Sequence, residues 1–212
     1  MNDSCKDFLY PVETKFSAAD PDPLREMERH SLARLRFVAC HKLPGLEKHL
    51  EGTALLALEI AKHLGLSERE KENLWYAASL HDIGKIGIDP LILTKEGSLS
   101  HEEFREIQAH TTYGEMILSG VDGEIYRCCA DVALSHHEQW DGKGYPHGLS
   151  GEQISLLSRI VAVADAYDCM TEGRPYQVAQ TNESADVELE RCTGTQFDPE
   201  LAELFRTKIR PV

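Results

Sequence analysis

Histidine and aspartate side chains recur at positions where this 212-residue chain could hold a metal ion. His81 and Asp82 stand side by side where an apolar stretch gives way to Gly84, and Lys85 follows directly. His136 and His137 form a second pair, just before a glycine-rich segment. Imidazole and carboxylate groups are common ligands of divalent metals in proteins. These residue types therefore predict a metal site.

Helical spacing directs further residues of these types toward the predicted core. His81 shares a helix face with Leu74 and Ala78, and an unpaired carboxylate at Asp165, within an apolar helix, would be costly. The candidate cluster consists of His49, His81, Asp82, His110, His136, His137 and Asp165.

Other interpretations exist for single members of this cluster. His110 alone would be interpreted as a hydrogen-bonded core histidine, and Asp165 alone as an ion-pair partner of Arg159. Gly114, four residues after His110, would either leave room beside the imidazole or allow close helix packing. The coincidence of five histidines and two aspartates at core-facing or helix-end positions favours one shared metal cluster.

The predicted donor set restricts the metal. No cysteine accompanies these histidines and aspartates in the pattern, and a set without thiolate suits iron, manganese, nickel or cobalt rather than a closed structural zinc site. Asp82 has two oxygens and could bridge two cations about 3.5–4 Å apart, a spacing that clamps a phosphate. Lys85, just beyond Gly84, could reach a phosphate oxygen.

Composition limits the function classes. The net charge of −14 argues against duplex nucleic acid or an anionic membrane as the main partner. We find neither a secretory signal nor an apolar run near the ~20 residues that a membrane span requires, so a cytoplasmic protein is expected. The six cysteines form no C-x-x-C pair, which favours reduced, mostly buried thiols.

The elements that must position the cluster are predicted to be helices, because helical periodicity dominates and strand alternation is scarce. Capping boxes at Ser67–Glu70 and Ser100–Glu103, and Asp198 followed by Pro199, mark three helix starts. The predicted helices cover residues 24–41, 46–64, 67–82, 100–118, 122–137, 153–170, 182–192 and a last one from 198. Residues 1–44 are expected to form an arm and helix, a linker or dimerisation segment, and residues 45–212 the metal-binding domain.

Longer motifs resemble a known family. The residues His49, His81-Asp82 and Asp165 resemble the HD superfamily of metal-dependent phosphohydrolases. The strings HDIGKIGI (81–88), HHEQWDGKGYPHGLSG (136–151), RIVAVADAYDCMTEGRPY (159–176) and GTQFDP (194–199) resemble its HD-GYP subfamily of cyclic di-GMP phosphodiesterases. The resemblance covers about residues 45–210 and implies an all-α bundle of about seven to eight helices with a glycine-rich GYP loop.

The resemblance also implies residue roles. All seven cluster residues would ligate metal, with Asp82 as the bridge, and a hydroxide bridging two metals would attack cyclic di-GMP to give pGpG and, in some members, GMP. Lys85 and Arg174 would contact phosphate, and Asp168 would orient a ligand or assist proton transfer. Gly144, Tyr145 and Pro146 would line the site and could also contact signalling proteins.

Departures from the family pattern lead to further expectations. Members with three metals have a glutamate four residues before the first histidine, where this chain has Gly45, and Glu47 would face away. We therefore expect two divalent ions, iron or manganese. Gln139 and Gln177 replace basic residues, which predicts weaker phosphate contacts. The alternative hypotheses are hydrolysis of another cyclic dinucleotide and a binding module without catalysis. The oligomeric state is left open.

Overall fold

Side-chain caps begin the helices at the predicted places. The computed structural model describes residues 22–43, 45–172 and 180–209. Ser67 and Ser100 each form a complete capping box, and Asp198 accepts hydrogen bonds from the backbone of Glu200 and Leu201. These caps satisfy backbone N–H groups that have no partner within the helix.

The described residues form an all-α fold, as predicted, and contain no β-strand. In chain order the elements are α2 (Pro23–Lys42), α3 (Leu46–His63), α4 (Glu68–Leu80), the 3-10 turn η1 (Ile83–Gly87), α5 (Pro90–Leu93), α6 (His101–Gln108), α7 (His110–Leu118), α8 (Glu124–Ser135), the 3-10 turn η2 (Gly151–Gln153), α9 (Leu156–Glu172), α10 (Asn182–Arg191), α11 (Pro199–Leu204) and the π-turn η3 (Phe205–Ile209).

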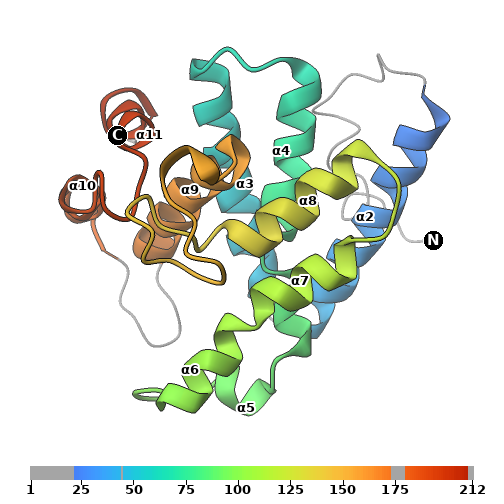
Figure 1. Ribbon diagram of the computed structural model, residues 1–212, viewed down its shortest axis with the longest axis horizontal. Coiled ribbons are helices and arrows are strands. Elements are labelled where there is room, and N and C mark those ends of the chain that lie inside the picture. Colours follow the sequence, from blue (N-terminus) through green and yellow to red (C-terminus); the bar gives the residue numbers. More distant parts are fainter. Residues whose placement is uncertain (1–21, 44, 173–179, 210–212) are drawn as a thin grey trace.

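The core lies between the helices that carry the candidate cluster. Helix α3 packs against α4 and α9, and α8 packs against α4 and α7. Buried apolar side chains such as Leu50, Trp75 and Ile160 fill the space between them. Figure 1 shows α2 on one side of this bundle and α10 with α11 on the other. The site-bearing helices are therefore held on both sides.

The single helix predicted over 100–118 is wrong, because the structure breaks it at Ala109 into α6 and α7. Three consecutive side chains, those of His110, Thr111 and Thr112, donate to the carbonyls of Ile107, Gln108 and Ala109. Side-chain donors of this kind compete with the regular backbone ladder. The break places His110 at the start of a new helix.

Other boundaries differ by a few residues. The helix expected to reach Asp82 ends at Leu80, so His81 and Asp82 lie in the turn that leads into η1. The helices expected over 122–137 and 153–170 cover Glu124–Ser135 and Leu156–Glu172 instead. The short α5 was not predicted, because a four-residue helix has no detectable period.

Buried polar contacts attach α2 to the bundle. The Arg25 guanidinium is 2% exposed and donates to Glu72 at 2.7 Å and to Asn73 at 2.8 Å. Glu28 accepts the backbone N–H of Ile125 at the start of α8 at 3.0 Å. The division at residue 44 into an N-terminal segment and a metal-binding domain stays a prediction.

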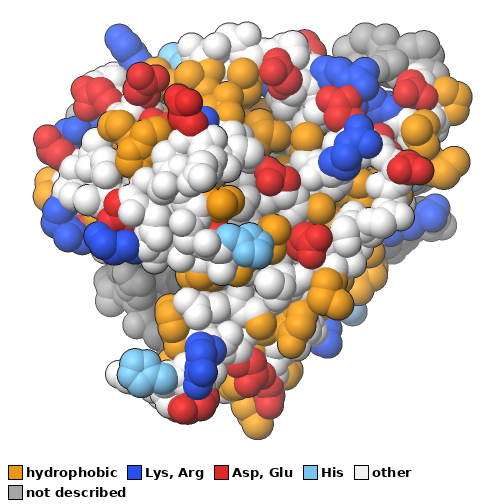
Figure 2. Space-filling view, viewed as in Figure 1, with side chains coloured by type: hydrophobic (Ala, Val, Ile, Leu, Met, Phe, Trp, Pro, Cys, Tyr) orange, Lys and Arg blue, Asp and Glu red, His pale blue; other side chains and the backbone are white. Residues whose placement is uncertain are grey.

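Charged side chains of both signs lie among hydrophobic ones on the face shown in Figure 2. On the face shown in Figure 2, acidic and basic side chains are interspersed, so the net charge of −14 is not gathered into one patch there. Within the described ranges, we find no helix with the length and apolar character that a membrane crossing requires.

Candidate metal centre

The ends of several helices converge on Asp82. His49 lies in the first turn of α3, and His81 and Asp82 follow α4. His110 begins α7, and His136 with its neighbour His137 follows α8. Asp165 lies within α9. The structure thus brings all seven predicted cluster residues together around one carboxylate.

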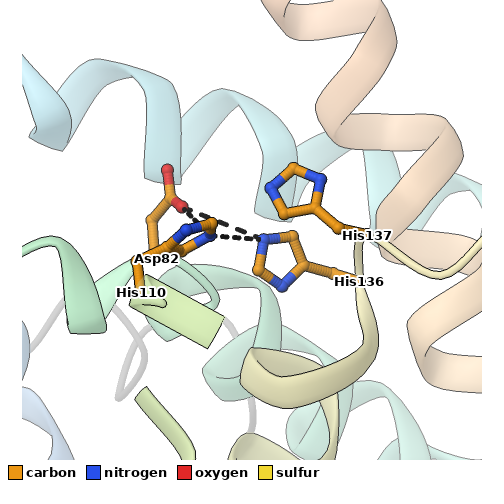
Figure 3. Close-up of side chains that lie close together, drawn as sticks. All are labelled: Asp82, His110, His136 and His137. Carbon is orange, nitrogen blue, oxygen red and sulfur yellow. Dashed lines mark hydrogen bonds and ion pairs between the residues drawn. The ribbon is translucent and has the colours of Figure 1, made fainter. Parts of the chain in front are cut away.

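One oxygen of Asp82 faces three histidines. Oδ1 lies 3.4 Å from Nε2 of His110 and 3.9 Å from Nε2 of His136, and the two Nε2 atoms are 3.4 Å apart. His137 completes this group, with donor atoms all within 4.8 Å of one another. Figure 3 shows the three imidazoles and the carboxylate directed at a common point. This arrangement suits a cation held by three nitrogens and one oxygen.

The second oxygen of Asp82 faces a different group. Oδ2 lies 3.8 Å from Nε2 of His49 and 3.5 Å from Nε2 of His81. Oδ1 of Asp165 lies 3.1 Å and 3.7 Å from the same two nitrogens. The ammonium of Lys85 forms an ion pair with Oδ2. Asp82 therefore separates two groups of donors, which is the geometry that a bridging carboxylate requires.

Backbone carbonyls orient three of the imidazoles. Nδ1 of His81 lies 2.7 Å from the Ala78 carbonyl, and Nδ1 of His136 lies 2.9 Å from that of Val132. Nδ1 of His110 contacts the Ile107 carbonyl at 2.5 Å. A carbonyl can only accept, so Nδ1 carries the proton in each ring. The lone pair of each Nε2 is then directed into the cluster and available to a metal.

A carboxylate orients the fourth imidazole. Nδ1 of His49 lies 2.7 Å from Oδ2 of Asp168, one turn beyond Asp165 on α9. Asp168 approaches α3 at Gly52, where an added Cβ would lie 2.0 Å from its Oδ1. An alanine at position 52 would displace this carboxylate. Of the two roles expected of Asp168, the contact supports ligand orientation, which is a common outer-shell role of carboxylates at metal sites.

Burial and local charges keep Asp82, His136 and His137 in the forms that bind cations. Burial alone would raise the pKa of Asp82, but Lys85 and His81 hold it well below its ordinary value. Burial lowers the pKa of His137 to about 3 and that of His136 well below its ordinary value. Burial also lowers the pKa of His49, but hydrogen bonds to Asp165 and Asp168 outweigh this and raise it to about 9.

Buried polar atoms in the cluster test whether the site fits a metal. Nε2 of His81 and Oδ1 of Asp82 are inaccessible to solvent and lack a hydrogen-bond partner, whereas Nε2 of His49 lies 3.1 Å from Oδ1 of Asp165. Leaving such atoms unpaired costs about 1–3 kcal/mol each, and native structures rarely tolerate it. Both unpaired atoms are directed at the cluster, where cations would satisfy them. The residues present therefore fit a metal centre.

The glycine-rich loop folds over His137. The Tyr145 ring stacks on the His137 ring with 4.8 Å between centroids, and the Tyr145 N–H donates to the His137 carbonyl at 3.2 Å. A Cβ at Gly144 would lie 2.3–2.5 Å from the backbone of residues 137–139, so only glycine allows this approach. The loop is thus built against a residue of the cluster.

The Glu138 carboxylate holds the loop from inside. It is 3% exposed and accepts the N–H groups of His147 at 2.7 Å and Leu149 at 3.0 Å. Arg159 supports the adjoining segment, because it lies over the Trp140 ring and donates to Asp198 at 2.5 Å. The loop conformation therefore depends on buried polar side chains.

We expect Glu138→Gln to weaken the loop. The amide retains only one acceptor oxygen, so one buried N–H loses its partner, which costs about 1–3 kcal/mol in the free energy of unfolding. Chemical denaturation measures the loss, and limited proteolysis of the loop reports its location. Glu152→Gln, an exposed change on η2, serves as the control. Equal stability of both variants would contradict the role given to Glu138.

Several expectations have different outcomes. Asp165 is not paired with Arg159, whose ion-pair partner is Asp198. Gly114 serves close packing, since its added Cβ would contact the Ala133 Cβ at 3.0 Å. Gly45 adopts a left-handed conformation with φ of 87° at the exposed N-cap of α3, and Glu47 is exposed. Arg174 and Gln177 lie outside the described residues.

The expectation that no thiol accompanies the cluster is wrong. Cys169 lies one turn after Asp165 on α9, and its Sγ is 3.2 Å from Oδ1 of Asp165. Sequence reasoning also missed Gly52 and Glu138. A glycine inside a helix one turn after His49 is a signal that could have identified Gly52, and an acid directly after a histidine pair could have identified Glu138.

The fold and the site together define an all-α domain with a buried histidine–aspartate centre. A family model described as HD domain matches residues 35–201. The chain belongs to the HD domain family.

Curated relatives are longer proteins. A cyclic di-GMP phosphodiesterase of Thermotoga maritima is 44% identical over 158 residues, covering 74% of this chain and 43% of that protein. The cyclic di-GMP phosphodiesterase response regulator RpfG of Xanthomonas campestris is 40% identical over 199 residues, covering 94% and 52%. A 3'3'-cGAMP-specific phosphodiesterase of Vibrio cholerae is 40% identical, covering 75% and 34%. The chain thus spans about half the length of the first two relatives or less.

Solved structures share the fold. The HD-GYP-type protein Bd1817 from Bdellovibrio bacteriovorus has a TM-score of 0.65 at 16% identity, covering 98% of this chain and 68% of that one. A cyclic GMP-AMP-specific phosphodiesterase of Vibrio cholerae has a TM-score of 0.59 at 23% identity, covering 82% and 46%.

Proposed function

We propose that this chain is a metal-dependent phosphodiesterase that hydrolyses cyclic di-GMP. The observation that carries the proposal is the position of Asp82, whose two oxygens face separate groups of imidazoles. Relatives at 40–44% identity that bear the name cyclic di-GMP phosphodiesterase support the substrate. The expected product is pGpG, with GMP as the product of a second cleavage.

The cluster would hold two divalent cations, iron or manganese. His110, His136 and His137 would hold one, His49, His81 and Asp165 the other, and Asp82 would bridge them. Bound divalent cations neutralise the charge of a phosphodiester and lower the pKa of water, which makes hydroxide available near pH 7. The orienting contacts of the imidazoles would keep the donors in place during this chemistry.

Residues around the cluster would act on the substrate. Lys85 is half-buried beside Asp82, and its ammonium would move from that carboxylate to a phosphate oxygen. Gly144, Tyr145 and Pro146 would form one wall of the binding site. Arg174 would contact a second phosphate of the dinucleotide. Asp168 would keep the His49 imidazole in its binding orientation and would accept or return a proton at Nδ1.

Anaerobic hydrolysis with Fe(II)- or Mn(II)-loaded protein tests this function. Cyclic di-GMP and 3'3'-cGAMP should be supplied separately and then in competition, with release of linear dinucleotide and GMP measured by chromatography. Faster turnover of cyclic di-GMP is the expected result. Faster turnover of 3'3'-cGAMP would instead indicate a cGAMP phosphodiesterase, the activity for which one relative is named. Binding without turnover by protein shown to hold metal would identify a binding module.

Lys85→Ala is expected to slow hydrolysis by about 10²–10³-fold while metal content stays unchanged. The estimate follows from the usual cost of removing one group that stabilises transition-state charge. Lys62→Ala removes an exposed lysine that pairs with Glu59 on α3 and should leave turnover unchanged. Metal analysis of both variants accompanies the rates. Loss of metal from Lys85→Ala would show that the lysine is needed to build the centre.

A further inference from the structure

Cys169 lies beside the donor atoms of His49 and Asp165. Its Sγ contacts Oδ1 of Asp165 at 3.2 Å. The same oxygen lies 3.1 Å from Nε2 of His49 and 3.7 Å from Nε2 of His81. Three potential metal ligands, one each with nitrogen, oxygen and sulfur, therefore lie together on the α9 side of the cluster, and His81 lies beside Asp165.

An unpaired nitrogen points to a ligand in this region. The His81 side chain is 0% exposed, and its Nε2 has no hydrogen-bond partner although its Nδ1 is fixed by the Ala78 carbonyl. Nε2 of His49 has the Asp165 carboxylate as its partner, at 3.1 Å. A proton on the Cys169 thiol can satisfy Asp165, but it leaves Nε2 of His81 unsatisfied. A cation would satisfy the nitrogens, the carboxylate and the sulfur together.

The separations agree with donors that share a cation. The donor atoms of His49, Asp165 and Cys169 all lie within 4.8 Å of one another. Metal–nitrogen and metal–oxygen bonds of about 2.0–2.2 Å and metal–sulfur bonds of about 2.3 Å place neighbouring donors roughly 3–4 Å apart. Small side-chain adjustments are therefore enough for a common centre.

We propose that the Cys169 thiolate is a direct ligand of the cation held by His49 and Asp165. On binding, the thiol loses its proton to solvent, and the sulfur lone pair that results bonds the cation in place of the S–H···O hydrogen bond. A thiolate favours zinc, cobalt or iron over manganese at this position. The inference rests on the metal centre of the proposed function but is independent of the substrate.

Cobalt(II) is a direct probe, because cobalt–thiolate bonds give a charge-transfer band in the near ultraviolet that nitrogen and oxygen ligands do not give. The protein is stripped with a chelator and loaded anaerobically with Co(II), and its cobalt content and spectrum are measured. We expect the band in the unaltered chain and its loss in Cys169→Ser. Serine keeps a hydroxyl donor for Asp165, so it separates ligation from hydrogen bonding.

Cys128→Ser is the matched control. Cys128 is also half-buried on a helix, but it precedes His136 by eight residues, about 12 Å along α8. This variant should keep the band. Competition between Zn(II) and Mn(II) gives a second measurement: Cys169→Ser should lose at least about tenfold in zinc affinity, with a smaller change for manganese.

Cobalt-loaded unaltered protein without the band would overturn the proposal and leave Cys169 as a hydrogen-bond donor to Asp165. A band that survives Cys169→Ser at full cobalt occupancy would also overturn it. Neither measurement uses a nucleotide. The protein could show the expected band and still hydrolyse no cyclic dinucleotide. That result would contradict the proposed function but not the proposal that Cys169 is a ligand.

Discussion

Asp82→Asn is expected to remove metal and hydrolysis together. The amide has one oxygen in place of two, so it cannot face both groups of histidines with an acceptor. Loss of the cations removes several kcal/mol of transition-state stabilisation, which corresponds to a fall in turnover of about 10³-fold or more. Metal analysis and initial rates, measured on the same preparation, check both effects.

Asp122→Asn is the control for this change, because it makes the same chemical substitution at an exposed position before α8. It should keep full metal content and turnover. Hydrolysis by Asp82→Asn at the rate of the unaltered chain would contradict the bridging role. Full metal content combined with lost hydrolysis would show that Asp82 acts on the substrate instead of the cations.

Gly84→Ala is expected to disrupt the packing of η1 against α7. Its Cβ would lie 1.9 Å from the His110 carbonyl oxygen and 2.5 Å from the Gly114 nitrogen, both backbone atoms that cannot turn aside. Overpacking of this kind lowers the free energy of unfolding by about 1–3 kcal/mol or more. The displacement moves Asp82 away from His110, so metal affinity should fall as well.

Gly87→Ala is a matched control three residues along the same turn. Its Cβ would contact only the Tyr113 ring, at 2.9 Å, and that ring is 39% exposed and free to shift. The cost should therefore stay within about 1 kcal/mol. Denaturation and metal titration of both variants give the comparison. Similar behaviour of the two would show that the η1–α7 contact does not support the centre.

The cluster could be predicted from the sequence because its members lie on regular helices or at their ends. His81 continues the apolar stripe of α4, and Asp165 lies inside an apolar run. Periodicity of this kind indicates which side chains face the core. It does not indicate which core-facing residues meet; the coincidence of seven metal-type residues favoured one cluster, and the resemblance to the HD family supplied their individual roles.

Contacts between distant segments could not be predicted from the sequence. The approach of Asp168 to Gly52, and of the Cys169 thiol to Asp165, depends on how α9 packs against α3 and on side-chain rotamers. The break at Ala109 has a local cause, but capping boxes and periodicity do not detect side chains that bond carbonyls three residues back. The fold class follows from pattern, and these details follow from packing.

The backbone anchoring of His81, His110 and His136 affects how readily mutation can damage the centre. Each ring takes its orientation from a carbonyl of the helix that precedes it in the chain, and every amino acid supplies such a carbonyl. Substitution of neighbouring side chains therefore leaves these three orientations intact. His49 depends instead on the Asp168 side chain, and through it on Gly52. In an unbiased mutational scan, the residues outside the cluster at which metal binding is most easily lost should accordingly, apart from Gly84, lie on the α3–α9 side.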